Sequence, residues 1–462
     1  MKRQLLLSYY GDDFTGSADV LESLSFKGVA TALFLEAPSL KEVIDFRLKN
    51  KRISADGKVK AFGVAGISRS LTPAQMDSVL PAIFKKISRI PTQYFHYKIC
   101  STFDSSPQVG NIGHAVTLAL RYFKASYIPL VVGIPLLNRF CVFGNLFGRA
   151  NETTYRLDRH PTMAKHPITP MNESDLRVHL SKQTATPVSL LDVLSLEDAN
   201  SSAVHYKKLQ KRGGYILFDV LENRHLNAIG KLIDTNVTKN LQLLVGSSAI
   251  EYALCNQWQK TGRIKKPVQN KLTKPAQRYL IAAGSCSPRT AEQIKHGLSI
   301  GYSPVRINCR KLIIDQALEI ESCVDACIKI LEKNKVPLLF SALGPDDPAI
   351  AEARTFYGEA KQDQLVGQFL GNAQGKIIKE IIDRTGKLRL SVAGGDTSGY
   401  VTKALGIYAL EVLIPIAPGA PLCLAHAKNN RYDGLEISLK GGQNGDKYFF
   451  DQVAKGNSKS EK

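Results

Sequence analysis

QLLLSYYGDDFTGSAD, residues 4–19, is the stretch that indicates the fold. Its apolar run and two tyrosines predict a buried strand, which ends at Gly11 and two adjacent acids. Residues 18–28, ADVLESLSFKG, then have the spacing of a helix closed by glycine. Neighbouring carboxylates repel each other and are costly to bury without a cation or a hydroxyl network. Asp12 and Asp13 therefore form either a surface turn or a ligand site.

Strand-like and helix-like segments alternate along the whole chain, which predicts an α/β fold with mainly parallel sheets. In the first half the predicted strands are QLLLSYYG, VATALFLE, VKAFGVAG, FHYKICS, YIPLVVGIP, GGYILFDV and LQLLVGSS. In the second half RYLIAAG is a predicted strand, followed by a helix with Ser287 as N-cap and Pro288 at its first position. Further helices are predicted over 316–333 and about 363–384.

The chain of 462 residues is long enough for two or three domains at ~150 residues each. The alternation stops at 261–278, a segment with six cations and no acid, which we interpret as a solvated linker. We therefore predict an N-terminal domain over 1–260, a C-terminal domain over 279–455 and a disordered tail over 456–462. The active site is expected in the cleft between the two domains.

The formal net charge of +20 favours anionic partners. The eight cysteines form no CxxC pair, and no apolar segment near the N-terminus is long enough for a secretory signal, which favours a reducing, cytoplasmic location. The most apolar stretches, 128–137 and 408–425, are too short or too interrupted to cross a bilayer. No helix-turn-helix or aromatic-interleaved basic patch is recognisable, so we expect neither nucleic acid nor membrane as partner.

Polar and charged residues follow four predicted strands of the N-terminal half. Ligands of open α/β sheets bind beyond the carboxyl ends of the strands, so these residues are expected at one edge. Acidic and hydroxyl side chains can form hydrogen bonds with the hydroxyl groups of a sugar, and an arginine or lysine can bind its carboxylate. Each turn alone could be structural, but four together favour a site for a small acidic polyol. The candidates are Asp12, Asp13, Arg69, Lys98, Asp104 and Arg139.

Glycines and hydroxyls follow three predicted strands of the C-terminal half, in AAGSCSPRT, VAGGDTSG and LKGGQNGD. Backbone N–H groups at such turns and at helix N-termini cradle phosphates, and Asp or hydroxyl groups can hold Mg²⁺. Neither the P-loop nor the dinucleotide fingerprint is present, so the predicted site is another kind of phosphate cradle. GGDTSG is the most specific of these turns. SALGPDD, 341–347, is a further strand end that could line the same site.

The segment 158–176 contains His160, His166 and three prolines, which predict an extended, ordered loop. Zinc binding is the weaker interpretation, because the two histidines lie six residues apart and no third ligand is near in sequence. A covering loop with hydrogen-bonded histidines is favoured, and such a loop can still touch a substrate.

A domain for an acidic polyol and a domain for polyphosphate together indicate a small-molecule kinase, because phosphoryl transfer depends on positioning, charge neutralisation and a base aimed at the acceptor hydroxyl. The motifs GDDFTG, KICSTFDSSPQVGNIG, AGSCSPRTAEQI, AGGDTSG and LKGGQNGD, in this order, resemble the four-carbon acid sugar kinase family. The resemblance covers nearly the whole chain, and the segment CSTFDS is most similar to the 3-oxo-tetronate kinase branch.

This resemblance implies a sugar-binding N-terminal domain, a nucleotide-binding C-terminal domain and ATP-dependent phosphorylation of a four-carbon acid sugar at its terminal hydroxyl, with Mg²⁺. It implies Asp12 or Asp13 as the base, and which of them acts is open. It implies sugar contacts from Arg69, Lys98, Asp104 and Arg139. The implied ATP contacts are Ser285, Gly394, Gly395, Asp396, Thr397 and Gly442.

The alternatives to a kinase are another enzyme for sugar acids and a binding protein without enzymatic activity. A dehydrogenase or metal-dependent aldolase for the same acids would need a dinucleotide fingerprint or a metal-ligand cluster, and the sequence shows neither. A sugar-acid sensor without kinase activity is the alternative function. The particular sugar acid, the metal ligands and the oligomeric state, including a homo-oligomer, stay open.

Overall fold

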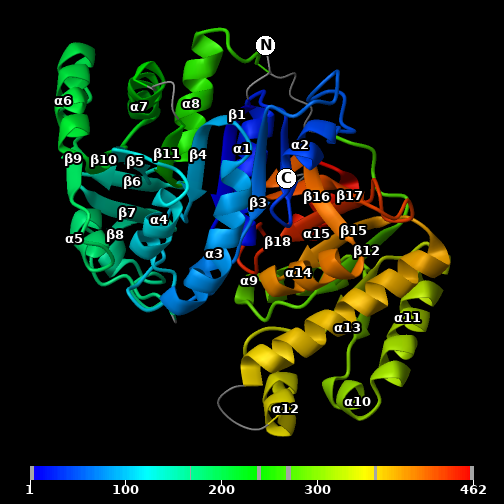
Figure 1. Ribbon diagram of the computed structural model, residues 1–462. Coiled ribbons are helices and arrows are strands. Elements are labelled where there is room, and N and C mark those ends of the chain that lie inside the picture. Colours follow the sequence, from blue (N-terminus) through cyan, green and yellow to red (C-terminus); the bar gives the residue numbers. More distant parts are fainter. Residues whose placement is uncertain (1–4, 167, 237–240, 267–271, 358–361, 458–462) are drawn as a thin grey trace. The chain divides into compact units, whose positions relative to one another are not determined.

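The computed structural model describes residues 5–166, 168–236, 241–266, 272–357 and 362–457. They belong to two compact units, Met1–Val268 and Gln269–Lys462, here called the N-terminal and C-terminal units (Figure 1). Residues 267–271 of the predicted linker and 458–462 of the predicted tail lie outside the described residues. Gly456 and Asn457, also in the predicted tail, pair with Thr273 and Leu272.

The N-terminal unit is built on a parallel sheet in the order β2-β3-β1-β4-β11-β5-β10-β9. The strands are β1 (Leu5–Gly11), β2 (Thr31–Phe34), β3 (Ala61–Ala65), β4 (Thr92–Lys98), β5 (Tyr127–Val131), β9 (Val188–Leu191), β10 (Gly214–Phe218) and β11 (Gln242–Gly246). Six consecutive residues of β1 are buried, as expected for a strand covered on both faces. This confirms the predicted α/β class and the mainly parallel sheet.

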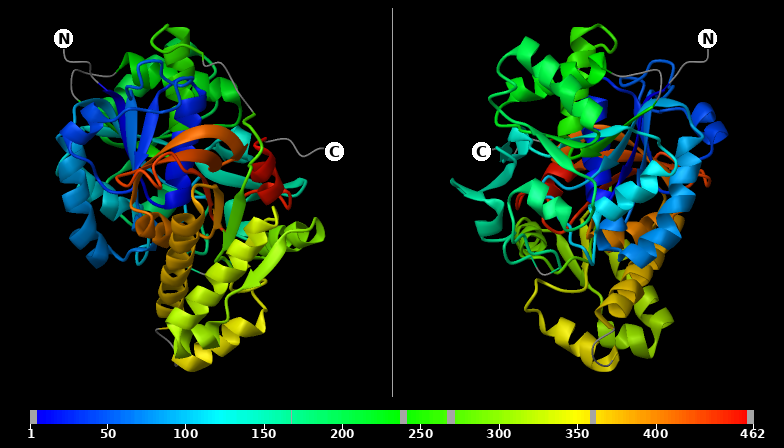
Figure 2. Two further views of the ribbon diagram at one scale, coloured as in Figure 1. Left: turned by 90° about the vertical axis from the view of Figure 1, so that its right-hand side faces the viewer. Right: turned by 60° about the vertical axis from the view of Figure 1, so that its left-hand side comes forward.

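Helices cover both faces of this sheet. The helices are α1 (Phe14–Phe26), α2 (Leu40–Asp45), α3 (Pro73–Ser88), α4 (Ile112–Leu120), α5 (Leu176–Ser181), α6 (Ala199–Arg212), α7 (Asn223–Thr235) and α8 (Ala249–Lys260). α1 and α7 both contact α8, and α6 contacts α7, whereas α3 contacts α4. The group α6–α8, drawn in green, stands together in Figures 1 and 2.

The first helix begins earlier than the sequence indicated. We predicted a helix over 18–28, but α1 starts at Phe14 because the Asp13 side chain accepts a hydrogen bond from the Gly16 N–H and caps it. The second acid of GDDFTG is therefore the N-cap of the helix, and the turn between strand and helix contains only Asp12 and Asp13.

A small antiparallel sheet follows β5. Its strands are β6 (Arg139–Val142), β7 (Asn145–Ala150) and β8 (Thr153–Arg156), in that order. The buried Asp219, which follows β10, accepts hydrogen bonds from the N–H groups of Phe143 and Gly144 in the β6–β7 turn. This carboxylate fixes the small sheet to the edge of the large one.

The C-terminal unit has a sheet in the order β13-β14-β12-β15-β18-β17-β16, in which only the last two neighbour pairs, β18–β17 and β17–β16, are antiparallel. The strands are β12 (Tyr279–Ala283), β13 (Ser303–Arg306), β14 (Pro337–Phe340), β15 (Arg389–Ala393), β16 (Ile407–Ala417), β17 (Ala420–Ala427) and β18 (Glu436–Lys440). A cluster of buried residues from β12, β14, β16, β17 and α15 forms a core of this unit.

The helices of this unit are α9 (Pro288–Ser299), α10 (Cys309–Ile314), α11 (Gln316–Glu332), α12 (Pro348–Tyr357), α13 (Gln362–Thr385), α14 (Gly395–Ala404) and α15 (Phe449–Lys455). The long helix α13 packs between α11 and α14, as Figure 1 shows in yellow and orange. Ser287 caps α9 and Pro288 is its first residue, which confirms that prediction. Within the described chain, no helix combines the length and apolar character needed to cross a bilayer.

Candidate active site

The sheet register of the N-terminal unit places its predicted site residues at one edge. Gly11, the last residue of β1, is level with Ala65 of β3 and Lys98 of β4. Lys98 is in turn level with Gly246, the last residue of β11. The segments that begin after these residues therefore start side by side, at the carboxyl edge where open α/β sheets bind ligands.

The Arg69 guanidinium lies between the two aspartates. It donates to Asp12 from Nε (3.1 Å) and Nη2 (2.7 Å), and to Asp13 from Nη1 (2.8 Å) and Nη2 (3.0 Å). The backbone N–H of Arg69 also donates to the Asp12 carbonyl (2.9 Å). One cation thus forms hydrogen-bonded ion pairs with both acids and offsets their mutual repulsion, which answers how the chain holds two adjacent carboxylates.

The two aspartates differ in exposure. The Asp12 side chain is 4% exposed and the Asp13 side chain 28%. Burial raises the pKa of Asp12, and Asp13 raises it further, whereas Arg69 opposes the shift. Asp13 Oδ1 accepts the helix-capping bond from Gly16, while Asp13 Oδ2 accepts from Arg69 Nη1. Asp13 is therefore the acid of the pair that a ligand can reach more easily.

Lys98 is buried, and its charge acts on Asp12. Its ammonium donates to the Ile99 carbonyl (3.0 Å) and lies 3.7 Å from Asp19 Oδ2 on α1. Burial raises the pKa of Asp19, and Lys98 opposes that shift. Asp19 was not among the predicted site residues, because nothing in its helical spacing sets it apart from a solvated acid.

Asp104 and Arg139 lie in the same electrostatic environment. Burial lowers the pKa of Arg139, and Cys100 and Asp104 oppose this shift. Burial likewise raises the pKa of Cys100, with Asp104 adding to the shift and Arg69 and Lys98 opposing it. Cys100 therefore lies within range of four of the six residues predicted for the sugar site, and the sequence analysis did not single it out.

His96 and Glu251 form a second buried pair behind this edge. Glu251 Oε1 lies 2.6 Å from His96 Nδ1, and the Gly246 carbonyl lies 3.0 Å from His96 Nε2. A carbonyl only accepts, so Nε2 is the donor to Gly246, and a second hydrogen bond joins Nδ1 to the carboxylate. This pair ties β4, β11 and α8 together next to Lys98, and it too was missed from the sequence.

In the C-terminal unit the ends of β12, β15 and β18 come together. The N–H groups of Gly284 and Ser285 donate to the Ala393 carbonyl (2.9 and 3.1 Å), and the Gly394 N–H donates to the Lys440 carbonyl (2.9 Å). These bonds bring three predicted ATP segments, around Ser285, Gly394 and Gly442, to one edge of the sheet.

Gly442 packs closely against the first turn of α9. Its carbonyl accepts from Ser287 Oγ (2.6 Å) and Thr290 Oγ1 (3.0 Å). A Cβ atom on Gly442 would lie 2.4 Å from Ser285 Oγ, so only glycine fits here without movement. Turns of this kind bind phosphate through the concavity that their backbone N–H groups form.

The start of α14 offers unpaired backbone donors. Gly394, with φ of 129°, precedes the helix, and in this part of the described chain no side chain caps the first turn. Gly395 and Asp396 are exposed, whereas Thr397 is buried against Gly284 and Gly394. The N–H groups of this turn and the Asp396 carboxylate are therefore free to meet phosphate and a cation.

Lys440 is the residue of this site that the sequence analysis missed. It is 1% exposed, and its ammonium donates to Thr290 Oγ1 (3.2 Å) and the Gly442 carbonyl (3.4 Å). Among the described residues, no carboxylate lies within ion-pair distance. Burial, with a smaller contribution from Arg289, lowers the pKa of Lys440 to about 7. The sequence feature that could have indicated Lys440 is its place at the end of a predicted strand, directly before two glycines.

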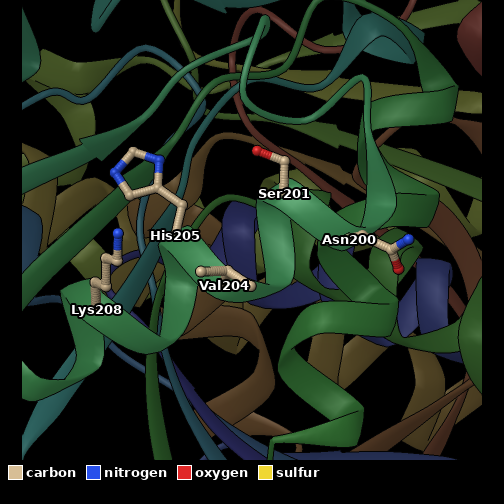
Figure 3. A pocket seen from close by; sticks show the side chains of 5 residues that line it. All are labelled: Asn200, Ser201, Val204, His205 and Lys208. Carbon is tan, nitrogen blue, oxygen red and sulfur yellow. The ribbon is translucent and has the colours of Figure 1, made fainter.

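Two of the hollows in the surface of the described residues differ in their relation to the candidate site. One, of about 600 Å³, lies in the C-terminal unit between the start of α9, at Pro288 and Ala291, and the loop after β14, at Gly344 and Asp347. It therefore adjoins the phosphate loops and involves the segment SALGPDD. The other, of about 460 Å³, is lined by α6 alone, and Figure 3 shows its five side chains on that one helix. No strand end contributes to it, so it is not part of the candidate site.

Comparison with known proteins places this geometry in a family. Residues 7–254 match the model of a sugar-binding N-terminal domain, and residues 280–450 match that of a nucleotide-binding C-terminal domain. The chain is 38% identical to a 3-oxo-isoapionate kinase of Paraburkholderia graminis, over 98% of this chain and 94% of that protein. It is 25% identical to a 3-oxo-tetronate kinase of Pectobacterium atrosepticum, over 97% and 98% of the two chains.

Solved structures share the fold. A Salmonella typhimurium protein matches with a TM-score of 0.76 at 23% identity, over 97% of this chain and 98% of that one. A Haemophilus influenzae protein matches with a TM-score of 0.73 at 22% identity, over 98% and 100%. With both domain models matched in order and the relatives aligned over almost their full length, the chain belongs to the four-carbon acid sugar kinase family.

Proposed function

We propose that the protein is an ATP-dependent kinase that transfers the γ-phosphoryl group of ATP to the terminal hydroxyl of a short acid sugar, releasing ADP and a proton. Residues 1–260 would bind the sugar and 279–455 the nucleotide, joined by 261–278. The observation that carries this proposal is the arrangement at Lys440: a buried cation with no carboxylate partner among the described residues, beside Gly442 and Ser285. An anion of high charge is the ligand that such a site lacks.

In the proposed nucleotide site the triphosphate lies on the loops after β12, β15 and β18. Gly395 and Thr397 would offer N–H groups, Gly394 would allow close approach of the backbone to the phosphates, and Ser285, Gly442 and Lys440 would complete the cradle. The nucleoside would occupy the hollow of about 600 Å³ beside Pro288 and Gly344.

Mg²⁺ is proposed as the cofactor. Among the described residues no group of three His, Cys, Asp or Glu side chains could hold a metal ion. Mg²⁺ on a nucleotide usually needs only one or two carboxylates, with phosphate and water as its other ligands. The exposed Asp396 fits that need, and the bound ion would neutralise charge on the transferred group.

In the proposed sugar site Asp13 faces the acceptor hydroxyl, since it is the more exposed acid and its Oδ2 is not the capping oxygen. Asp12 and Arg69 would hold it in place. Arg69 has both aspartates as partners, so Arg139 is the better candidate to bind the substrate carboxylate. Lys98 would act as a fixed positive charge.

An ADP-release assay tests the proposal. The panel should contain 3-oxo-tetronate, 3-oxo-isoapionate, and the threonate and erythronate isomers, because the names of the relatives point to 3-oxo acids. At least one acid should raise ADP release far above the rate without sugar. If none does, while the protein still binds ATP in a calorimeter, the alternative of a sugar-acid sensor gains support instead.

A further inference from the structure

Three side chains at the start of α9 hold the loop after β18. Ser287, Thr290 and Gln293 follow one another at intervals of three residues, so they share one side of the helix. Ser287 Oγ (2.6 Å) and Thr290 Oγ1 (3.0 Å) donate to the Gly442 carbonyl. Gln293 Nε2 donates to the Asn444 carbonyl (3.0 Å). The start of α9 and this loop are therefore tied together by hydrogen bonds.

Thr290 differs from the other two because its hydroxyl also contacts the buried lysine of the site. Lys440 Nζ lies 3.2 Å from Thr290 Oγ1 and 3.4 Å from the Gly442 carbonyl. An ammonium group only donates, so Thr290 Oγ1 accepts from Lys440 while its own hydrogen goes to the Gly442 carbonyl. Thr290 is fully buried, so bulk solvent does not compete for this hydroxyl.

The remaining surroundings of Lys440 oppose or only weakly favour a positive charge. The charged groups on the loop and on the helices near the end of β18 are Arg289 and Glu292 of α9, Asp396 of α14, Asp446 and Lys447 of the loop, and Asp451 of α15. In the part of the chain that the structure describes, none of these carboxylates forms an ion pair with Lys440. Burial, with a smaller effect of the Arg289 charge, lowers the pKa of Lys440 to about 7.

Three groups favour the protonated lysine. They are the Thr290 hydroxyl, the Gly442 carbonyl and the Phe449 ring, whose centroid lies 5.8 Å from Nζ. Thr290 Oγ1 is the nearest of the three. Since hydrogen bonds to the charged form stabilise that form, this hydroxyl acts directly on the ability of Lys440 to hold its proton.

We propose that Thr290 is a positioning residue of the nucleotide site: its hydroxyl holds the Lys440 ammonium in place and in its protonated form, and so determines the pH range over which the protein binds ATP. The proposal rests on the proposed function and extends it to the control of the same site by pH. Thr290 acts through Lys440 and is not itself a contact of the nucleotide.

The proposal makes a specific statement about pH. Without the hydroxyl the pKa of Lys440 falls further. At low pH the lysine is charged with or without the hydroxyl, so ATP meets the same cation. At higher pH, ATP binding must restore a proton that the lysine holds less firmly. Loss of the Thr290 hydroxyl should therefore weaken ATP binding at high pH and leave it nearly unchanged at low pH.

Thr290→Val tests the role of the hydroxyl. Valine has nearly the shape of threonine, and the Gly442 carbonyl keeps Ser287 as donor. We expect the ATP affinity of Thr290→Val to lie about tenfold below wild type at pH 8, the factor for a pKa lower by one, and within about twofold of wild type at pH 5.5. Thr290→Ser, which keeps the hydroxyl, should match wild type at both. Calorimetry of all variants at each pH removes the contribution of ATP's own protonation.

Gln293→Met is the matched control. It removes a hydrogen bond between α9 and the same loop without changing a group bonded to Lys440. Any loss of ATP affinity in this variant comes from the loop itself, so its factor should be the same at pH 5.5 and pH 8. A pH-independent factor in Thr290→Val as well would give Thr290 only a structural role and would overturn the inference.

Lys440→Met provides the second readout. In that background Thr290→Val has no ammonium to act on, so the double variant should bind ATP as Lys440→Met alone does. If Thr290→Val instead weakens ATP binding as much in Lys440→Met as in wild type, Thr290 does not act through Lys440 and the inference is wrong. Should Thr290→Val fail to fold, Thr290→Ala removes the same oxygen and replaces it in both experiments.

The outcomes separate the inference from the proposed function. If wild type binds ATP and Thr290→Val loses the same factor at every pH, the inference is wrong and the proposed function stands. If wild type binds no ATP at any pH from 5.5 to 8, the proposed nucleotide site fails, and the proposed function fails with it.

Discussion

Asp12 and Asp13 share one arginine but have different surroundings. Both oxygens of each acid accept from Arg69. Asp12 is buried, whereas Asp13 is more exposed and its Oδ1 also caps the helix. A carboxylate that must accept a proton from a substrate needs an accessible oxygen within hydrogen-bond reach. The structure therefore gives different expectations for two neighbouring residues of the same type.

Asp13→Asn and Asp12→Asn distinguish these roles. Asparagine is as good an N-cap as aspartate, so Asp13→Asn should leave the free energy of unfolding within about 1 kcal/mol of wild type while kcat falls by about 10²-fold or more. Asp12→Asn breaks a buried ion pair and should lower the free energy of unfolding by about 3 kcal/mol, with a smaller loss of kcat. Urea unfolding and steady-state kinetics measure both. Loss of turnover in Asp12→Asn alone would reverse the assignment.

Lys440 should make nucleotide binding depend on pH. Its pKa is about 7 in the folded protein, so above pH 7 the free protein holds it mostly neutral, and an anionic phosphate must restore the proton. The ATP affinity should fall as the pH rises from about 7 to 9, by up to about tenfold per pH unit. Lys440→Met should bind ATP more weakly at pH 7 and lose this part of the pH dependence. Calorimetry at several pH values measures it, with the exposed Lys403→Met as control.

Lys440 should also make the free energy of unfolding depend on pH, in a direction that follows from its lowered pKa. Its pKa is lowered from 10.5 to about 7, so between these values the unfolded chain binds more protons than the folded one. The contribution of Lys440 to the free energy of unfolding therefore rises with pH across this window. The difference in stability between wild type and Lys440→Met should change in that direction in urea titrations at pH 7 and 9. A difference that stays constant would mean that the ammonium is not desolvated.

At the scale of elements, the loop after β18 depends on a glycine. Gly442→Ala places a methyl group 2.4 Å from Ser285 Oγ, so the loop or the serine must shift. We expect the KM for ATP to rise about tenfold, the effect of a change of about 1.4 kcal/mol, with the KM for the sugar unchanged. Adding Ser285→Ala removes the clashing oxygen and should restore thermal stability. An unaltered KM for ATP in Gly442→Ala would remove this loop from the nucleotide site.

The elements themselves were largely predictable from the sequence. Buried parallel strands such as β1 stand out as apolar runs, and the cap of α9 has its full signature at Ser287 and Pro288. The predicted start of α1 was four residues too late, because an aspartate that caps a helix and an aspartate that binds a ligand look alike in sequence. Lys440, Asp19 and the His96–Glu251 pair were missed, since burial and partners across the sheet are tertiary properties that local spacing does not encode.

At the scale of the whole molecule, the net charge of +20 is compatible with anionic substrates. A positive protein attracts ATP and sugar acids from a distance, and salt weakens this attraction because the Debye length falls to about 3 Å at 1 M. We expect kcat/KM for the acid sugar to fall as potassium chloride is raised from low to high concentration, with kcat much less affected. A neutral polyol such as threitol, in binding measurements, is the control. Equal salt dependence for both ligands would show that the charge does not act on the substrate.

The two units should respond to different ligands. Each unit contains paired strands of its own, and the proposed sugar and nucleotide contacts belong to different units. A bound ligand slows hydrogen exchange at the backbone groups that it covers or stabilises. In exchange experiments on the full chain, threonate should protect peptides that contain 11–17, 66–70 and 98–104. ADP should protect peptides that contain 283–287, 394–398 and 440–442. If ADP protected 11–17 and had no effect at 394–398, the proposal that the C-terminal unit binds the nucleotide would be contradicted.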